Sequence, residues 1–295
     1  MSKKAFIFPG QGSQYVGMAK DLFEKSVEAK EMIKTADDIL GVNLSYIMFN
    51  GPEDELKQTR LTQPAIFLHS VILAGIIRTL DADVAAGHSL GEYSAYVASG
   101  VIQFHEALKL VQARGSAMQE AGENNKGTMA AVIGLEPDVV EKICSVASVV
   151  GIVQCANFNS TGQIVISGSL EGVKKAMELS KNAGAKIVKE LAVSAAFHSP
   201  LMLSAKGKLQ SALDATNFYQ SKFPVYTNVS AKPVNNIPEI KSLLNEQIIA
   251  PVRWEETIKN MISDGIEEFY EIGPGNVLQG LVKRINPDVK RFGID

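Results

Sequence analysis

The chain is 295 residues long, with 46% hydrophobic residues, 21% charged residues and a formal net charge of −3 at pH 7. A chain of this length and composition can bury a sizeable core, which predicts one large domain, alone or with a small one. No run of basic residues occurs. Nucleic acid is therefore not an expected partner, because phosphate contacts require clustered Lys and Arg.

Sequence features typical of membrane insertion or secretion are missing. The apolar stretch at residues 5–8 is too short for a signal peptide, and the apolar segment 65–77 is too short for a bilayer span of about 20 residues. Cys144 and Cys155 have neither a disulfide-framework spacing nor a zinc-site spacing. We therefore predict a cytoplasmic protein with no membrane partner and no metal site, in which both cysteines are buried small hydrophobic residues.

Short apolar runs alternate with segments of helical periodicity, a pattern that predicts a parallel sheet covered by helices on both faces. Up to residue 126 the pattern predicts strands 5–8 and 83–86 and helices 18–40, 64–80, 90–99 and 104–120. After residue 191 it predicts strands 224–228 and 267–272 and helices 199–215, 239–249, 255–263 and 277–285. We therefore expect a large α/β domain of the parallel-sheet, α/β hydrolase-like type.

The segment from residue 127 to residue 191 has a different order of predicted elements. It reads as strand 128–133, helix 137–146, strand 150–156, strand 163–167, helix 170–182 and strand 186–190. The order βαββαβ is that of the ferredoxin-like unit, which can close a small core of its own. We predict an inserted ferredoxin-like subdomain at 127–191 within a large catalytic domain formed by 1–126 and 192–295, with a ligand cleft between them.

The motif GHSLGE at 87–92 follows a predicted strand and opens a predicted helix, which is the context of a nucleophile elbow. So tight a reversal leaves no room for side chains two residues before and after Ser89, where Gly87 and Gly91 stand. The first free N–H of the helix, that of Leu90, can then stabilise an oxyanion formed when the serine attacks a carbonyl. Since G-x-S-x-G also arises by chance, a plain glycine turn stays an alternative.

A second glycine loop, PGQGSQ at 9–14, directly follows the first predicted strand, at the end where open sheets bind ligands. We interpret the backbone N–H of Gln11 as a candidate second oxyanion donor. A phosphate or dinucleotide loop is a weaker interpretation, because the third glycine and a following Lys-Ser or Lys-Thr pair are missing. A structural turn is the other alternative.

The candidates for a general base are four histidines. His69 lies in an apolar helix and is interpreted as a core residue, His105 begins an amphipathic helix, and His88 points to the other side of the serine turn. His198 ends the loop that leaves the small subdomain and precedes a helix that starts with proline, so it could face the cleft and reach Ser89. From this position alone, a bystander role for His198 stays open.

Arg114 lies among apolar residues on the helix that follows the elbow helix, so it could present its charge at the floor of the cleft. A guanidinium binds a carboxylate through two parallel hydrogen bonds, which selects both the position and the sign of a substrate group. The alternative is a surface arginine beside an acid such as Glu120.

Five motifs in this order resemble the malonyl-CoA:acyl carrier protein transacylases, the acyltransferase family of fatty acid and polyketide synthases. They are GQGSQ at 10–14, GHSLGE at 87–92, QARG at 112–115, FHS at 197–199 and EIGPG at 271–275. The resemblance covers the whole chain. It implies transfer of a malonyl group from malonyl-CoA to the phosphopantetheine thiol of acyl carrier protein, for fatty acid synthesis, through a covalent malonyl-serine and without a cofactor. We expect a monomer, although the sequence itself does not show whether the chain works alone.

The resemblance implies a role for each matching residue. Ser89 is the nucleophile and His198 the base, in a dyad that has no acidic third member. The family also implies an oxyanion hole from the backbones of Gln11 and Leu90, a carboxylate clamp at Arg114, and a main-chain carbonyl at Gln247 that orients the histidine.

Two other functions stay open at this stage. Phe197, just before the histidine, resembles the variant linked to malonyl rather than methylmalonyl, yet an acyltransferase of a polyketide pathway would carry the same motifs. A serine hydrolase or thioesterase is less favoured. The α/β hydrolases place their histidine after the last strand, whereas no histidine follows His198 here.

Overall fold

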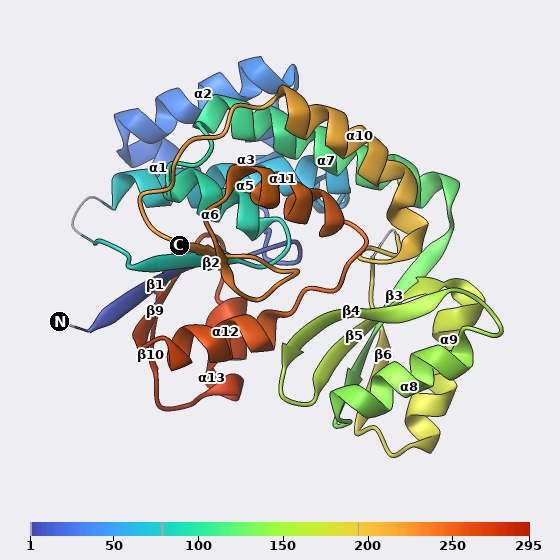
Figure 1. Ribbon diagram of the computed structural model, residues 1–295. Coiled ribbons are helices and arrows are strands. Elements are labelled where there is room, and N and C mark those ends of the chain that lie inside the picture. The colour runs from blue at the N-terminus through green and yellow to red at the C-terminus, as the bar shows by residue number, and fades with distance from the viewer. Residues whose placement is uncertain (1, 78–79, 194) are drawn as a thin grey trace.

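The computed structural model describes residues 2–77, 80–193 and 195–295, and its centre is a six-stranded sheet (Figure 1). The strand order is β10-β9-β1-β2-β7-β8, and every pair is parallel except the antiparallel pair β7 and β8. The strands are β1 (Lys3–Phe8), β2 (Val84–Gly87), β7 (Val225–Tyr226), β8 (Pro233–Val234), β9 (Ile266–Ile272) and β10 (Lys290–Ile294). The predicted α/β fold with a parallel-sheet core is confirmed.

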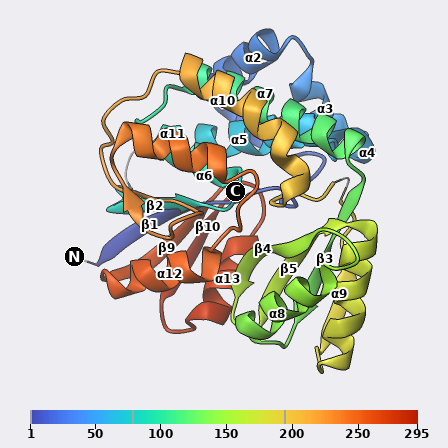
Figure 2. The ribbon, with the colours of Figure 1, turned by 45° about the vertical axis from the view of Figure 1, so that its right-hand side comes forward.

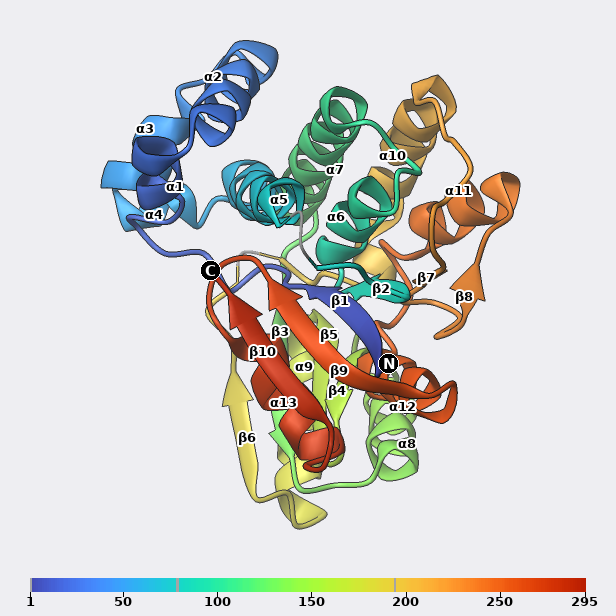
Figure 3. The ribbon, with the colours of Figure 1, turned by 90° about the vertical axis from the view of Figure 1, so that its left-hand side faces the viewer.

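Helices cover both faces of this sheet (Figure 3). One face carries α1 (Lys20–Lys25), α2 (Val27–Leu40), α3 (Leu44–Asn50), α4 (Glu53–Leu56), α5 (Thr59–Ile76), α6 (Gly91–Ala98), α7 (Phe104–Asn124), the 3₁₀ turn Pro200–Met202, α10 (Leu203–Ala215) and α11 (Ile237–Glu246). The other face carries α12 (Trp254–Ser263) and α13 (Val277–Ile285). Trp254, the first residue of α12, is fully buried and anchors that helix there. Within the described ranges, none of the helices has the length and apolar character needed to cross a bilayer.

A separate antiparallel sheet lies beside the parallel one (Figure 2). It is built by β3 (Gly127–Ile133), α8 (Pro137–Ala147), β4 (Val153–Ser160), β5 (Gln163–Ser169), α9 (Leu170–Asn182) and β6 (Ile187–Glu190), with strand order β4-β5-β3-β6. The predicted βαββαβ order is therefore confirmed. The two helices lie on the outer face and close a core that contains both cysteines. The exact domain boundaries, 1–126 with 192–295 and 127–191, stay a prediction.

Several predicted element boundaries are wrong, and the reasons are local. The helix predicted at 18–40 is divided at Ser26, whose extended backbone (φ −120°) ends α1 and whose hydroxyl accepts from the N–H of Ala29 to cap α2. Helix α5 begins at Thr59 and contains Pro64 rather than starting there. Pro64, the sixth residue of α5, has no N–H to donate to the carbonyl four residues earlier, yet the helix continues beyond it. Residues 78 and 79 of the predicted helix lie outside the described residues.

The remaining differences concern short or edge elements. The strand predicted at 150–156 is Val153–Ser160, because Val149 and Val150 are exposed in the preceding turn despite their apolar character. Helices α3 and α4 and strands β8 and β10 were not predicted. The two helices are seven and four residues long, and both strands lie at the edges of the sheet, so none carries a long periodic pattern.

Candidate active site

The serine turn lies between β2 and α6, at the carboxyl end of the parallel sheet. Ser89 has φ 51°, in the left-handed region that non-glycine residues seldom adopt. A Cβ on Gly87 would lie 1.8 Å from the carbonyl carbon of Gly91, and a Cβ on Gly91 would lie 2.0 Å from the carbonyl oxygen of Phe8. Both positions therefore require glycine, and the packed reversal holds the serine in its strained conformation.

His198 reaches Ser89 from 109 residues further along the chain. Its Nε2 lies 2.8 Å from the serine Oγ, and its Nδ1 lies 2.8 Å from the carbonyl oxygen of Gln247 and 3.2 Å from that of Ala250. Carbonyl oxygens only accept, so Nδ1 carries the proton and Nε2 accepts from the serine hydroxyl. Burial, followed by the charge of Arg114, lowers the pKa of His198 to about 3, which leaves the imidazole neutral.

Arg114 is fully buried, so the alternative of a surface arginine is wrong. Its Nη1 donates to Gln63 Oε1 (2.8 Å), and its Nη2 donates to Ser89 Oγ (3.0 Å) and Gln247 Oε1 (2.9 Å). All three acceptors are neutral, and in the described ranges no carboxylate lies within ion-pair distance of this guanidinium. Burial lowers its pKa. Since a buried charge is costly without a partner ion, the site favours an anionic ligand group.

A cavity of about 130 Å³ opens over these groups. Its walls include Ser89, His198, Arg114, Gln11, Leu90 and Phe197. The structure therefore brings the predicted residues to one cavity, with Gln247 directly behind it. Among the described residues, nothing accepts a hydrogen bond from the backbone N–H of Leu90 or of Gln11, so both donors are available to a ligand.

Sequence reasoning missed the residue that fastens the serine turn. Asn228 Oδ1 accepts from the N–H of Ser89 (2.7 Å), and its Nδ2 donates to the carbonyl of Gly87 (2.6 Å). Asn228 ends the strand predicted at 224–228, and the carboxyl ends of neighbouring parallel strands meet at one sheet edge. This rule could have placed Asn228 beside the serine turn from the sequence alone. Gln63 and Glu92, which also contact site groups, gave no comparable signal.

Two other histidines, His88 and His69, have partners other than the serine hydroxyl. His88 Nε2 is 2.8 Å from Asn159 Oδ1, and its ring packs 5.6 Å from that of Trp254. His69 is buried, with its Nε2 3.4 Å from a carboxylate oxygen of Asp295, and burial lowers its pKa to about 4. The described residues contain no group of three His, Cys, Asp or Glu side chains arranged as metal ligands. The absence of a cofactor stays a prediction.

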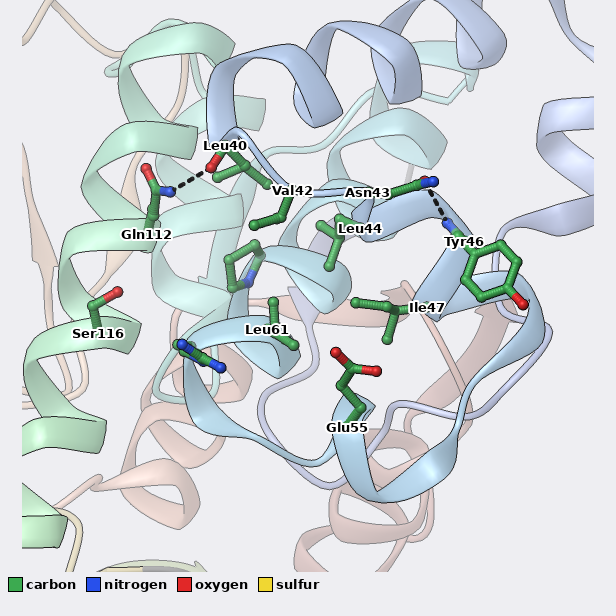
Figure 4. A pocket seen from close by; sticks show the side chains of 12 residues that line it. Leu40, Val42, Asn43, Leu44, Tyr46, Ile47, Glu55, Leu61, Gln112 and Ser116 are labelled. Carbon is green, nitrogen blue, oxygen red and sulfur yellow. Dashed lines mark hydrogen bonds between the residues drawn. The ribbon is translucent and has the colours of Figure 1, made fainter.

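A larger hollow of about 540 Å³ lies elsewhere, among α2, α3, α4, α5 and α7 (Figure 4). Aliphatic side chains such as Leu40, Leu44 and Leu61 line much of it. On one wall, Gln112 Nε2 donates a hydrogen bond of 3.1 Å to the carbonyl oxygen of Leu40. None of the predicted site residues lines this hollow. Its described lining places no serine beside a histidine, whereas the smaller cavity does, so the serine cavity is the candidate active site.

The α/β fold, with a serine and a histidine facing one cavity, is that of an enzyme of the acyl-transferring class. A family model described as "Acyl transferase domain" matches residues 5–290. The chain therefore belongs to the acyl transferase family.

Curated relatives carry a narrower name. A protein of Bacillus subtilis strain 168 named malonyl CoA-acyl carrier protein transacylase is 43% identical over 297 residues, which cover 100% of this chain and 94% of that protein. A protein of Staphylococcus aureus strain COL with the same name is 43% identical over 295 residues, covering 100% of this chain and 96% of that protein.

Solved structures agree with these relatives. An acyl carrier protein S-malonyltransferase from Vibrio cholerae has a TM-score of 0.96 and 41% identity, over 100% of this chain and 97% of that one. A malonyl-transacylase in complex with a type II PKS acyl-carrier protein has a TM-score of 0.96 and 40% identity, over 99% of this chain and 96% of that one.

Gly91→Ala tests the packing of the serine turn. The added methyl group would overlap the Phe8 carbonyl, so we expect a loss of about 3 kcal/mol or more in the free energy of unfolding, measured by denaturant titration. The matched control is Gly207→Ala in α10, where nothing lies within 4 Å of the new methyl group and stability should be unchanged or higher. Equal effects of the two substitutions would contradict the packing argument.

Proposed function

We propose that the chain transfers a malonyl group from malonyl-CoA to the phosphopantetheine thiol of acyl carrier protein, supplying extender units for fatty acid synthesis, through a malonyl ester on Ser89. One observation carries the proposal. The Ser89 hydroxyl lies between a neutral imidazole at 2.8 Å and a buried guanidinium at 3.0 Å that has no carboxylate of its own in ion-pair contact within the described chain. The names of the curated relatives support the same reaction.

In the first half-reaction, Ser89 Oγ attacks the thioester carbonyl while its proton passes to His198 Nε2. The N–H groups of Leu90 and Gln11 stabilise the oxyanion. The carbon–sulfur bond then breaks, and the imidazolium returns the proton to the leaving thiolate of coenzyme A. During the charged stage, the Nδ1–H of the imidazolium stays hydrogen-bonded to the carbonyl of Gln247.

The second half-reaction runs the same steps with the carrier thiol. His198, neutral again, takes the proton of the phosphopantetheine thiol, and the thiolate attacks the malonyl ester. The ester carbon–oxygen bond breaks, and the proton returns to Ser89 Oγ. No redox change occurs and the atoms balance without a further reactant, so we propose a cofactor-free double displacement.

Arg114 and Phe197 account for the proposed acyl specificity. Arg114 would exchange its neutral contacts for the malonyl carboxylate and hold it through two parallel hydrogen bonds. Phe197 is 6% exposed and lines the small cavity, where its ring would crowd a branched α-carbon. Malonyl therefore fits this site better than methylmalonyl. Action as a cytoplasmic monomer stays a prediction.

Transfer to the carrier protein of a polyketide pathway is a second candidate, favoured by the 40% identity to a malonyl-transacylase solved with a type II PKS acyl-carrier protein. A comparison of kcat/KM for fatty acid and polyketide carriers from the same organism separates the two. Hydrolysis of the acyl ester by water is a third outcome, and it would appear as release of free malonate without a carrier.

The acyl-enzyme is the central test. Incubation with malonyl-CoA, an acid quench and peptide mapping should place one malonyl group on Ser89, and added holo carrier protein should remove it. Ser89→Ala should abolish the label while leaving the fold intact, because alanine introduces no new atoms into the turn. A malonyl group on any other residue, or no label at all, would overturn the proposal.

Arg114→Ala tests the carboxylate clamp. Loss of one partner of a desolvated ion pair should lower kcat/KM for malonyl-CoA by about 30-fold or more, or about 2 kcal/mol, with a much smaller change for acetyl-CoA. Arg114→Lys is the matched control, since it keeps the charge and loses the two parallel hydrogen bonds. Its kcat/KM for malonyl-CoA should lie between that of the unchanged protein and that of Arg114→Ala. Parallel losses for the two donors would remove the assignment.

The pH profile tests the base. A lowered pKa means that His198 binds its proton only at lower pH, so the neutral form persists as the pH falls. The rate of Ser89 acylation by acetyl-CoA should therefore stay nearly constant from pH 6.5 to pH 5. For an ordinary histidine, with a pKa of about 6.5, the fraction of neutral imidazole would fall by more than about tenfold over this range, and the rate would fall with it. A decline centred near pH 6.5 would contradict the prediction.

A further inference from the structure

A buried acidic side chain lies behind the cavity, at Glu92 in the first turn of α6. The residue is 1% exposed. Its Oε2 accepts from the N–H of Asn228 (2.9 Å) and from Nε2 of Gln247 (2.7 Å), while Oε1 has no hydrogen-bond partner among the described residues. A carboxylate buried with one oxygen unpaired is poorly compensated by neutral donors alone. Its ionisation therefore depends on the charges nearby.

The side chain of Gln247 connects this carboxyl to the guanidinium. Its Oε1 accepts from Arg114 Nη2 (2.9 Å), and its Nε2 donates to Glu92 and, at 3.0 Å, to the carbonyl of Ser89. The amide thus presents its acceptor to the positive group and its donor to the negative one. An ionised Glu92 would therefore balance the charge of Arg114 across one neutral bridge, without direct contact.

The groups that act on Glu92 are few. Burial raises its pKa to about 7, opposed by hydrogen bonds from Asn228 and Gln247 and by the charge of Arg114 on α7. Tyr96, one turn later on α6, and the adjacent Tyr93 are the other titratable groups that interact with it, and both are neutral because burial raises their pKa values. The described parts of α5, β1 and β2, which also pack on α6, add no charge there. Arg114 is therefore the charge whose neutralisation would change the protonation of Glu92.

We propose that Glu92 is the resident counter-anion of Arg114 and that it takes up one proton from solvent when the malonyl carboxylate binds to Arg114. This inference rests on the proposed function. The incoming carboxylate neutralises the charge that favours ionised Glu92 and adds a like charge nearby, and both effects favour the protonated acid. The proton binds to a carboxyl oxygen of Glu92 and leaves again when the malonyl group departs on the carrier.

Such an exchange would keep the charge of the closed site constant. Before binding, the site holds Arg114 and ionised Glu92, and after binding it holds Arg114 and the malonyl carboxylate. The negative oxyanion of the reaction then forms beside a neutral Glu92 rather than a charged one, which matters in a desolvated site where charges interact strongly. Glu92 contacts no substrate atom and acts through Gln247 and Arg114.

The linkage has a definite sign. Because binding takes up a proton, raising the pH opposes malonyl binding, by up to about tenfold in affinity per pH unit while free Glu92 is ionised and bound Glu92 is protonated. This pH range begins near 7, because the pKa of Glu92 without a bound malonyl group is about 7. Below about pH 6, Glu92 is protonated in both states and the dependence disappears.

Proton uptake can be measured directly by titration calorimetry in buffers of different ionisation enthalpy. Ser89→Ala protein blocks acyl transfer, so that only binding is observed. Malonyl-CoA is compared with acetyl-CoA, whose phosphates are identical and therefore cancel. At pH 8 we expect malonyl-CoA to take up more than about half a proton beyond acetyl-CoA, and at pH 5.5 almost none.

The matched variant is Glu92→Gln in the Ser89→Ala background. It keeps an oxygen acceptor for Asn228 and Gln247 and removes the titrating group, so the difference between the two thioesters should vanish at every pH. If the difference persists in this variant, the proton binds elsewhere and the inference is wrong. If the variant does not fold, the comparison of the two thioesters in Ser89→Ala protein decides alone.

The outcomes also separate this inference from the proposed function. If malonyl-CoA neither binds nor acylates Ser89, both proposals are overturned. If it binds and acylates Ser89 but exchanges the same number of protons as acetyl-CoA at pH 8, only the role of Glu92 is overturned.

Discussion

The strained reversal at Ser89 is the constraint on which the rest of the site depends. A serine with φ 51° keeps this strained conformation only if the surrounding structure holds it there. Here the ends of the three neighbouring strands β1, β2 and β7 hold it. The end of β1 packs its Phe8 carbonyl against Gly91, and the segment after β7 supplies Asn228, which binds both sides of the turn. The parallel sheet therefore determines where the hydroxyl points before any other site residue is considered.

The antiparallel sheet contributes to the base rather than to the nucleophile. Gln154 on β4 donates to the carbonyl of His198 at 2.8 Å and to that of Ile249 at 2.9 Å, so one side chain ties together the loop of the histidine and the loop behind it. Asn157 on β4 also pairs with Val252 through an isolated parallel β-bridge of the backbone. Because His198 itself has φ 54°, its loop also needs external support. An inserted sheet beside the main one supplies that support.

Local sequence patterns predicted the parts of the site that local structure creates. The serine turn follows from glycine spacing between a strand and a helix, and the buried position of Arg114 follows from its apolar neighbours. Gln247 came only from the family resemblance, because no local pattern marks a residue that acts through its carbonyl. Asn228 binds a backbone group 139 residues away, a pairing set by strand order that no short window contains. The short helices α3 and α4 and the edge strands β8 and β10 were not predicted for a related reason, since they are too short to carry a periodic pattern.

Among the described residues, carbonyl oxygens rather than a carboxylate contact His198 Nδ1, and the electrostatics of this cavity give a reason. In a Ser–His–Asp triad, a carboxylate stabilises the imidazolium and sets the tautomer. Here the carbonyl oxygens of Gln247 and Ala250 set the tautomer without a charge. A carboxylate in their place would add a negative charge close to Arg114 and would compete with an anionic acyl group for that guanidinium. The same arginine helps to lower the pKa of His198, which keeps the imidazole neutral, so under the proposed mechanism one buried cation would both select the acyl group and prepare the base.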